Sequence, residues 1–547
     1  MAKPGARTTS VPLDGRVTDH RPLATHGTRD LRGRMPRRIT IVGAGPGGLA
    51  AAMLLARSGA EVTVLERQER IGGRTGIIEM EGFRFDVGPT FFLYPRVLEE
   101  LFAACGRSLR REVELIRVDP LYNLVFESGG ELRVHNDAQR LAKAVAELCP
   151  HDAEAIPRYM ADNRMKLEAF RPVLESPFHG MRSLMAPNVL KALRHLRPWR
   201  TVETDLREHF RDPRVRLAFS FQSKYLGMSP FKCPSLFTIL SFLEHEHGIW
   251  HPRGGCHAVI EAMARVARQM GVRIRTGEEV TGLRFEGRRV TRVVTPQGEH
   301  ACDGLVVNAD FAHAMRRLVP DNLRRRWHDR KLEKAKFSCS TFMLYLGIEG
   351  LVDLDHHTIL LSRDYERNLA EIEAGEAPPT NPSIYVQNAC ITDPELAPRG
   401  HSTLYVLVPV GNDSGRIDWP AIAPAFRAKI LKRLELLGLH DIESRIRVER
   451  MVTPHDWRDG FHIHRGATFN LAHNIGQMLH NRPRNRFEDL DGVYLVGGGT
   501  HPGSGLPVIF EGARITSRLL AQDLGLSLNW AANEDQPFTH ALAAEAD

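Results

Sequence analysis

The sequence predicts an α/β protein in which a Rossmann-like domain is interleaved with a second domain of mixed sheet and helices. Three observations predict this class. A strand, a glycine loop and a helix follow one another within residues 38–66, and the same order recurs within 492–520. Strand-like segments within 272–309 indicate that the chain returns to the first sheet between these two units. At 547 residues, the chain also exceeds the usual size of a single core.

The first strand–loop–helix unit has the pattern of a dinucleotide-binding site. Gly43, Gly45 and Gly48 have GxGxxG spacing, and Glu66 follows 18 residues after Gly48, where a second strand ends. In this pattern the glycines serve, in order, a tight turn, the approach of a pyrophosphate to the backbone, and close packing of helix on strand. We therefore expect these residues and Ala44 to bind the cofactor, with phosphate at the helix N-terminus.

Glu66 also narrows the choice of cofactor. Its carboxylate can accept hydrogen bonds from ribose hydroxyls and would repel a 2′-phosphate, which favours FAD or NAD over NADP. The alternative is a membrane span, since Ile39 to Ala56 is 18 residues long and uncharged. Four glycines and Pro46 lie in its first ten residues, where a spanning helix needs every backbone hydrogen bond closed internally. The dinucleotide interpretation is therefore preferred.

Composition excludes several other classes. The net charge of +7 is modest and fits either mild attraction to an anionic membrane surface or no role at all. No zinc-finger spacing or aromatic RNA-binding signature supports a nucleic-acid partner. The seven cysteines form no CxxC, so we expect neither a disulfide framework nor a metal site. We expect the protein to be located in a reducing cytoplasm.

A second cofactor signal follows directly after Glu66. Arg67 and the segment RIGGRT come next, in which Gly73 permits close backbone approach and Arg74 can neutralise phosphate. The alternative is a plain glycine turn with surface arginines, but its position after the ribose-binding acid argues against that. The motif FDVGPTFF, which contains Gly88, then follows.

The RIGGRT and FDVGPTFF motifs resemble the bacterial-type phytoene desaturase family of FAD-dependent carotenoid oxidoreductases. WHPRGG at 250–255 and GGGTHPGSGLP at 497–507 continue the resemblance, which covers nearly the whole chain beyond residue 37. It implies FAD as cofactor and an amine-oxidase/GDI-like architecture. It also implies that Val280 contacts adenine, and that Gly498, Gly499, Thr500 and Leu506 lie at the flavin.

The resemblance implies desaturation of a linear C30 or C40 isoprenoid in carotenoid biosynthesis. A hydride leaves an allylic carbon for flavin N5, and a proton then leaves the adjacent carbon, so a weak base suffices. By motif position His501 and Glu511 are the candidate bases, although each fits a structural role equally well. Oxygen or a quinone is the expected electron acceptor, because no second GxGxxG supplies a NAD site.

Residues 188–200 predict a basic amphipathic helix with Trp199 at its end. Such a helix is either an interfacial membrane anchor or an ordinary surface helix. Because the implied substrate partitions into bilayers, we expect a cytoplasmic protein peripherally associated with the inner membrane.

Related functions stay open on sequence grounds. They are a carotenoid oxygenase or ketolase, an isomerase, a retinol-saturase-like enzyme, an amine oxidase, and a non-catalytic prenyl-lipid carrier of GDI-like architecture. The expected division is a disordered basic arm (1–36), three parts of the FAD-binding domain (37–135, 251–325 and 485–525), a membrane-facing helical substrate region (136–250), a substrate sheet with helices (326–484) and a tail (526–547). The arm lacks the apolar centre of a secretory signal, and an organelle-targeting segment is its alternative.

Overall fold

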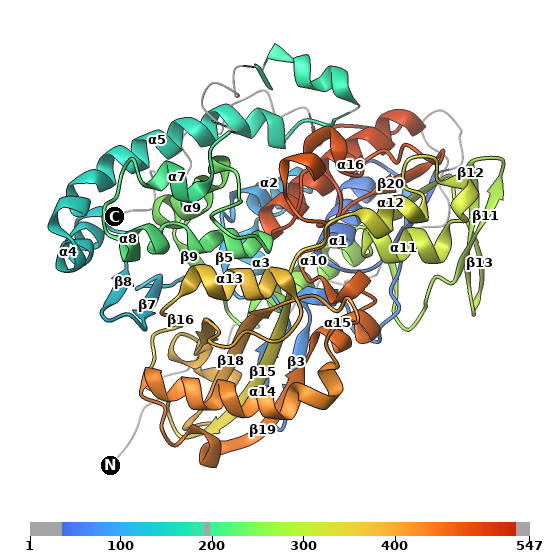
Figure 1. Ribbon diagram of the computed structural model, residues 1–547. Coiled ribbons are helices and arrows are strands. Elements are labelled where there is room, and N and C mark those ends of the chain that lie inside the picture. Colours follow the sequence, from blue (N-terminus) through green and yellow to red (C-terminus); the bar gives the residue numbers. More distant parts are fainter. Residues whose placement is uncertain (1–35, 179, 188, 191–196, 198, 532–547) are drawn as a thin grey trace, which may run out of the picture. The chain divides into compact units, whose positions relative to one another are not determined.

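The computed structural model describes residues 36–531 except 179, 188, 191–196 and 198 (Figure 1). The expected basic arm, the C-terminal tail from 532 and most of the expected amphipathic helix at 188–200 therefore lie outside the described residues. The described residues from Arg37 to Ala531 form one compact unit. No helix in its described part is long and apolar enough to cross a membrane.

The cofactor-type sheet is parallel and has five strands, in the order β10-β2-β1-β14-β20. Its strands come from three distant parts of the chain: β1 (Arg38–Val42), β2 (Glu61–Leu65), β10 (Arg273–Arg275), β14 (Gly304–Val307) and β20 (Val493–Leu495). The uncharged stretch 39–56 is thus divided between β1 and helix α1 (Pro46–Arg57), as the dinucleotide interpretation requires.

Helices cover this sheet because each has a strongly apolar face. They are α1, α10 (Cys256–Gln269), α11 (Phe311–Leu318) and α16 (Leu506–Leu524). Helix α1 packs against both α10 and α16 (Figure 1), and nine of its residues are buried. Short side chains in α1, such as Ala50 and Ala51, allow this close packing.

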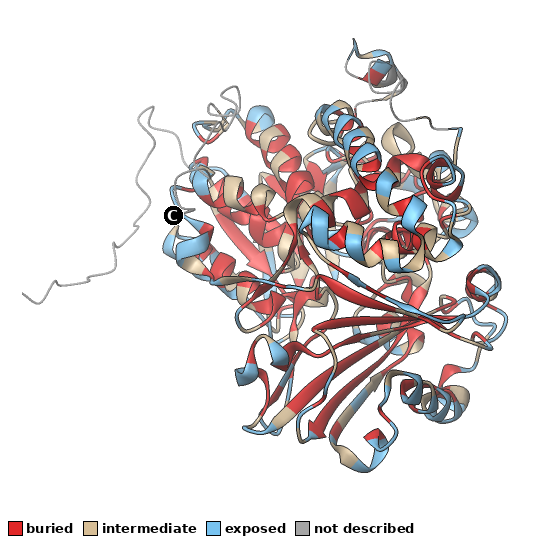
Figure 2. Cartoon of the chain, turned by 90° about the vertical axis from the view of Figure 1, so that its left-hand side faces the viewer, coloured by how far each residue is buried: buried red, intermediate tan, exposed pale blue. Residues whose placement is uncertain are grey.

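A second, mixed sheet has the order β19-β15-β18-β17-β16-β7-β8. Its strands are β7 (Tyr122–Phe126), β8 (Glu131–Val134), β15 (Ser340–Glu349), β16 (His357–Leu361), β17 (Ile384–Gln387), β18 (His401–Val410) and β19 (Ile446–Val452). Only the β16–β7 pairing is parallel among these described strands. Helix α14 (Trp419–Leu434) covers one face of this sheet. The central strand β15 has buried side chains on both faces (Figure 2).

The remaining elements form a helical region and small sheets. The helices are α2 (Arg96–Ala104), α3 (Leu109–Glu112), α4 (Ala138–Leu148), α5 (Pro150–Leu174), α7 (Val202–Leu206), α8 (Pro213–Ala218), α9 (Ile239–His247), α12 (Asp329–Lys334), α13 (Tyr365–Ala374) and α15 (Pro454–Gly460). The strands are β3 (Ile77–Met80), β4 (Phe83–Asp86), β5 (Phe92–Leu93), β6 (Leu115–Arg117), β9 (Ile249–Pro252), β11 (Gly282–Glu286), β12 (Arg289–Thr295) and β13 (Gly298–Ala301). All seven cysteines are free thiols.

Candidate functional site

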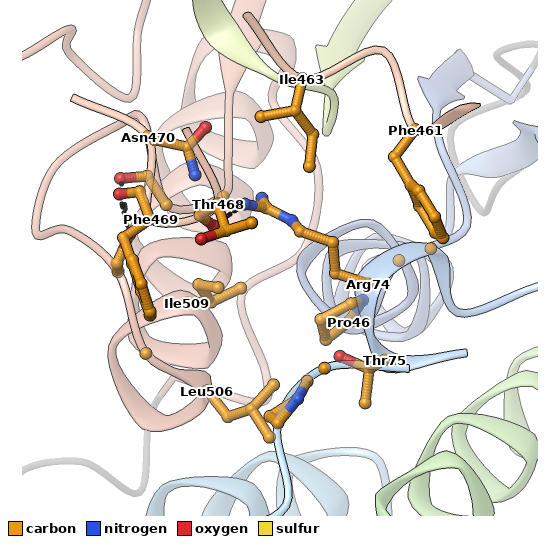
Figure 3. A pocket seen from close by; sticks show the side chains of 18 of the residues that line it. Pro46, Arg74, Thr75, Phe461, Ile463, Thr468, Phe469, Asn470, Leu506 and Ile509 are labelled. Carbon is orange, nitrogen blue, oxygen red and sulfur yellow. Dashed lines mark hydrogen bonds between the residues drawn. The ribbon is translucent and has the colours of Figure 1, made fainter. Parts of the chain in front are cut away.

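One cavity of about 530 Å³ connects the parallel sheet with the mixed sheet. This volume is within the range of small-molecule and cofactor sites. Figure 3 shows how segments far apart in the sequence meet there: Pro46 and Arg74 from the first cofactor unit, Phe461 to Asn470, and Leu506 with Ile509 from α16. The cavity has a glycine-rich end and an aromatic end, which we call the cofactor half and the apolar half.

The first glycine loop forms one wall of the cofactor half. Gly43 has φ +95°, a conformation that favours glycine, and a Cβ there would lie 2.4 Å from the Asn308 carbonyl oxygen. A Cβ on Gly48 would lie 2.1 Å from the Gly43 oxygen, whereas one on Gly45 would meet nothing closer than the Asn308 amide at 3.1 Å. Gly45 is the N-cap of α1 and supplies no side-chain cap, so the first N–H groups of the helix stay available to an anion.

Glu66 fixes the shape of this loop. Its carboxylate accepts hydrogen bonds from the backbone N–H of Ala44 at 2.8 Å and of Gln68 at 2.9 Å, and it also lines the cavity. Arg74 is half-buried opposite and donates to the Thr468 carbonyl oxygen. Burial lowers the pKa of Arg74, and the nearby Asp310 opposes that change. Phosphate-binding backbone, a ribose-type carboxylate and a cation thus share one end of the cavity, which fits a dinucleotide.

The second glycine loop, between β20 and α16, closes the cofactor half. Gly498 lines the cavity, and a Cβ there would lie 2.6 Å from Ser504 Oγ. The guanidinium of Arg482, which is fully buried, donates to the carbonyl oxygens of Gly498 at 2.6 Å and Thr500 at 3.2 Å. Leu506 begins α16, whose N-cap also supplies no side-chain hydrogen bond.

Most of the residues predicted to bind the cofactor meet at this cavity. The lining includes Gly43, Gly45, Glu66, Arg67, Gly73, Arg74, Gly88, Val280, Gly498 and Leu506. Ala44, Gly48, Gly499 and Thr500 are not in the lining; they lie within the two loops and shape them. Contact of each residue with FAD stays a prediction.

The two candidate bases lie elsewhere. The His501 ring is buried, with Nε2 at 3.0 Å from the Ser176 carbonyl oxygen and its centroid 4.9 Å from that of Phe178. Burial lowers the pKa of His501 to about 4. Glu511 accepts a hydrogen bond from Arg514 at 3.1 Å, and burial raises the pKa of Glu511 to about 7. Neither side chain lines the cavity, and a catalytic role for either stays a prediction.

The apolar half is lined by aromatic and branched side chains from several elements. They include Phe91, Phe221, Leu240, Leu243, Ile359, Leu361, Tyr385, Tyr405 and Leu407. The Phe91 ring stacks on His357 at a centroid distance of 4.1 Å. Such a lining holds a hydrocarbon by burial of apolar surface and excludes water from it.

Sequence reasoning missed two residues of this site. Arg482 has no local motif, since its acceptors are carbonyl groups brought together only by folding. Lys224 lines the cavity beside Phe221 and Tyr225, in a segment whose pattern predicts nothing more than a helix. Burial lowers the pKa of Lys224 to about 8.

A parallel sheet with two phosphate-type glycine loops, opening into an apolar chamber, defines the class as a dinucleotide-dependent oxidoreductase. The profile of the flavin-containing amine oxidoreductases matches residues 46–524, and that of the pyridine nucleotide-disulphide oxidoreductases matches residues 4–79. Among curated proteins, the chain is 41% identical to the 4,4'-diapophytoene desaturase (4,4'-diapolycopene-forming) of a Methylomonas species, covering 89% of this chain and 95% of that protein. It is 34% identical to the lycopene-forming phytoene desaturase of Pantoea ananas, covering 89% and 99%.

The chain therefore belongs to the flavin-containing amine oxidoreductase family, in the group of the carotenoid desaturases. Its cofactor is FAD, as the sequence predicts. Solved structures agree in fold: putrescine oxidase bound to putrescine has a TM-score of 0.58 at 16% identity and 90% coverage of this chain and 99% of that one. A Rab GDI from Plasmodium falciparum has a TM-score of 0.51 at 12% identity, covering 89% and 98%. The predicted amine-oxidase/GDI-like architecture is confirmed.

Proposed function

We propose that this protein is an FAD-dependent desaturase of a linear C30 or C40 isoprenoid, such as dehydrosqualene or phytoene. The observation that carries the proposal is the single cavity whose cofactor half continues into an apolar half. The two relatives named above are a diapophytoene desaturase and a phytoene desaturase. This similarity favours a desaturase over an oxygenase, an isomerase, a retinol saturase or a lipid carrier.

The residues of the cavity divide the work. The N-terminus of α1 and Arg74 bind the pyrophosphate, and Glu66 binds ribose hydroxyls. The second glycine loop and the N-terminus of α16 stabilise negative charge at the ring edge. FAD, when bound, supplies a two-electron acceptor. The aromatic residues of the apolar half hold successive carbons of the substrate in place and keep water away from them.

The test is anaerobic reaction of the FAD-loaded protein with phytoene or dehydrosqualene in liposomes. We expect loss of flavin absorbance and appearance of polyene absorption bands. Leu243→Trp fills the apolar half, so it should keep bound flavin and lose at least about tenfold in rate. Leu436→Trp, at a residue 53% exposed, is the matched control. If neither a C30 nor a C40 chain bleaches the flavin, the proposal is wrong.

We further propose that the protein works on the cytoplasmic face of the inner membrane and passes electrons to oxygen or a quinone. Support comes from Met185 (70% exposed), Leu190 (47%) and Trp199 (75%), which lie close in sequence to Arg197 and Arg200. Met185→Asp with Trp199→Asp should reduce flotation with anionic vesicles, whereas Leu351→Asp, at an equally exposed position, should not. Equal flotation of both variants would contradict membrane docking.

A further inference from the structure

Lys224 places a basic nitrogen inside the apolar half of the cavity. It belongs to a 3-10 helix, Phe221–Leu226, in which Phe221, Tyr225 and Leu226 also line the cavity. Its side chain is half-buried, and within the described part of the chain its amine forms no ion pair and no hydrogen bond. An amine that faces an apolar cavity loses hydration when a hydrocarbon fills that cavity, so its presence there needs a reason.

The backbone holds Lys224 in this place. Gly227 ends the 3-10 helix with φ +67°, and a Cβ on it would lie 2.6 Å from Ser338 Cβ. The helix end is therefore pressed against the segment that leads into β15. The thiol of Cys339 on that segment also lines the cavity and interacts electrostatically with the Lys224 amine.

Among the described residues, no carboxylate forms an ion pair with Lys224. Glu244 of α9 lies behind the wall, where it accepts hydrogen bonds from Tyr122 at 3.1 Å and Gln222 at 2.9 Å. Tyr365 of α13 and Cys339 also line the cavity, and burial raises the pKa of both, so both stay neutral near pH 7. With the pKa of Lys224 lowered to about 8, its neutral amine is well populated at pH 7–8.

We propose that Lys224 Nζ is the catalytic base that takes the proton from the substrate during desaturation. This inference rests on the proposed function. One allylic C–H bond breaks as a hydride, which carries two electrons to the cofactor. The C–H bond on the adjacent carbon then breaks; its electron pair forms the new C=C bond and its proton goes to the neutral amine. The ammonium returns this proton to water after the product leaves.

The sign of the pH dependence follows from charge. A protonated Lys224 cannot accept a proton, and it repels the positive charge that develops on the polyene. Anaerobic flavin bleaching should therefore become faster as the pH rises, with a midpoint near 8 set by the amine. If the ammonium instead served as an anchor for negative charge, bleaching would slow above this pH.

The first experiment compares variants in single-turnover bleaching. Lys224→Met keeps the volume and removes the base, so we expect at least about a 100-fold loss of rate and loss of the pH-dependent limb. Lys224→Arg keeps the charge and should be slow at every pH. Ethylamine should restore part of the rate of Lys224→Ala, which a purely structural role would not produce. Lys232→Met, at a solvent-exposed ion pair with Glu373, is the control and should react like the wild type.

The second experiment does not depend on turnover. Competitive acetylation of FAD-loaded, substrate-free protein, read by mass spectrometry, should give Lys224 a midpoint near 8. Wild-type rates in Lys224→Met with normal flavin content, or an active Lys224→Arg, would overturn the inference alone. A wild-type protein that titrates at Lys224 but bleaches with no isoprenoid would overturn the proposed function, and the inference with it.

Discussion

Gly45 and Gly48 belong to one motif but act on different properties of the protein. A Cβ on Gly48 would collide with the Gly43 oxygen at 2.1 Å, so this glycine is required by the fold itself. A Cβ on Gly45 meets only the Asn308 amide at 3.1 Å, and it would occupy space at the N-terminus of α1 where phosphate is expected. The motif therefore joins a packing requirement to a binding requirement.

We expect Gly45→Ala to fold normally and to lose about tenfold in FAD affinity, because the added methyl group keeps the pyrophosphate away from the backbone N–H groups. Gly48→Ala should instead lower the free energy of unfolding by about 1–3 kcal/mol through overpacking. Thermal melts of the flavin-free proteins and FAD titration measure the two effects separately. Equal effects of the two substitutions on both quantities would contradict this division.

At the scale of a residue, the sequence revealed those site residues whose role is local. Glu66 could be predicted because its position at the end of β2 sets both its backbone partners and its place in the cavity. His501 was proposed from its position within the second glycine loop, but its ring turns toward Ser176 and Phe178. Lys224 could not be predicted, since only tertiary packing brings its helix to the cavity wall.

At the scale of an element, Arg482 organises the second glycine loop. It crosses from the segment before β20 to the carbonyl groups of Gly498 and Thr500, and to that of Leu471 at 3.1 Å. Arg482→Met removes a hydrogen-bond donor from each of these buried carbonyl groups. We expect a loss of about 3–5 kcal/mol in the free energy of unfolding, together with weaker flavin binding.

Urea denaturation with fluorescence detection measures the loss of stability, and the flavin-to-protein ratio measures binding. Arg486→Met is the matched control, because Arg486 forms an exposed ion pair with Asp523 and should contribute less than about 1 kcal/mol. A stable, flavin-loaded Arg482→Met protein would show that the loop holds its shape without this guanidinium.

The buried carboxyl of Glu244 on α9 makes stability depend on pH. Burial raises its pKa from 4.5 to about 7, so between these values the folded protein keeps a proton that the unfolded chain has lost. Stability therefore falls as the pH rises through this window, by up to about 3 kcal/mol for this group. Glu244→Gln removes this contribution and should be more stabilising at pH 8 than at pH 5, measured by urea denaturation.

Glu511 has a pKa raised to about 7 by its own burial, so the variant will keep part of the wild-type slope. The difference between the two proteins isolates Glu244. The same difference at pH 5 and pH 8 would show that the Glu244 carboxyl titrates normally.

At the scale of the whole molecule, the cofactor half is completed by segments from both ends of the chain. FAD bound there links β1, β2 and β20 and should stabilise the entire fold. At a free FAD concentration 100 times its dissociation constant, we expect a gain of about 2.7 kcal/mol and a rise in melting temperature of about 3 °C. Gly45→Trp should show no such rise. Separate transitions for the two sheets would contradict a single cooperative unit.

The architecture could be predicted where elements that are adjacent in the sequence are also neighbours in the fold. The strand–glycine–helix units at 38–66 and 492–520 have the order expected, with β20 at Val493–Leu495 and α16 beginning at Leu506. The mixed sheet could not be assembled in this way, because β7 pairs with β16 across more than 200 residues of chain. Such neighbours are set by burial of side chains from distant segments, and no periodicity within either strand records them.

The strands of the parallel sheet are far apart in the sequence, which has a consequence during synthesis. Strand β20 and α16 are translated last, roughly 450 residues after β1, so at ~5–20 residues per second the nascent chain waits on the order of tens of seconds for them. Throughout that interval the apolar half of the cavity is incomplete, and the isoalloxazine ring cannot bind there to cover it. The coenzyme therefore cannot protect the nascent polypeptide from aggregation, and riboflavin starvation should increase aggregation of the finished chain as well.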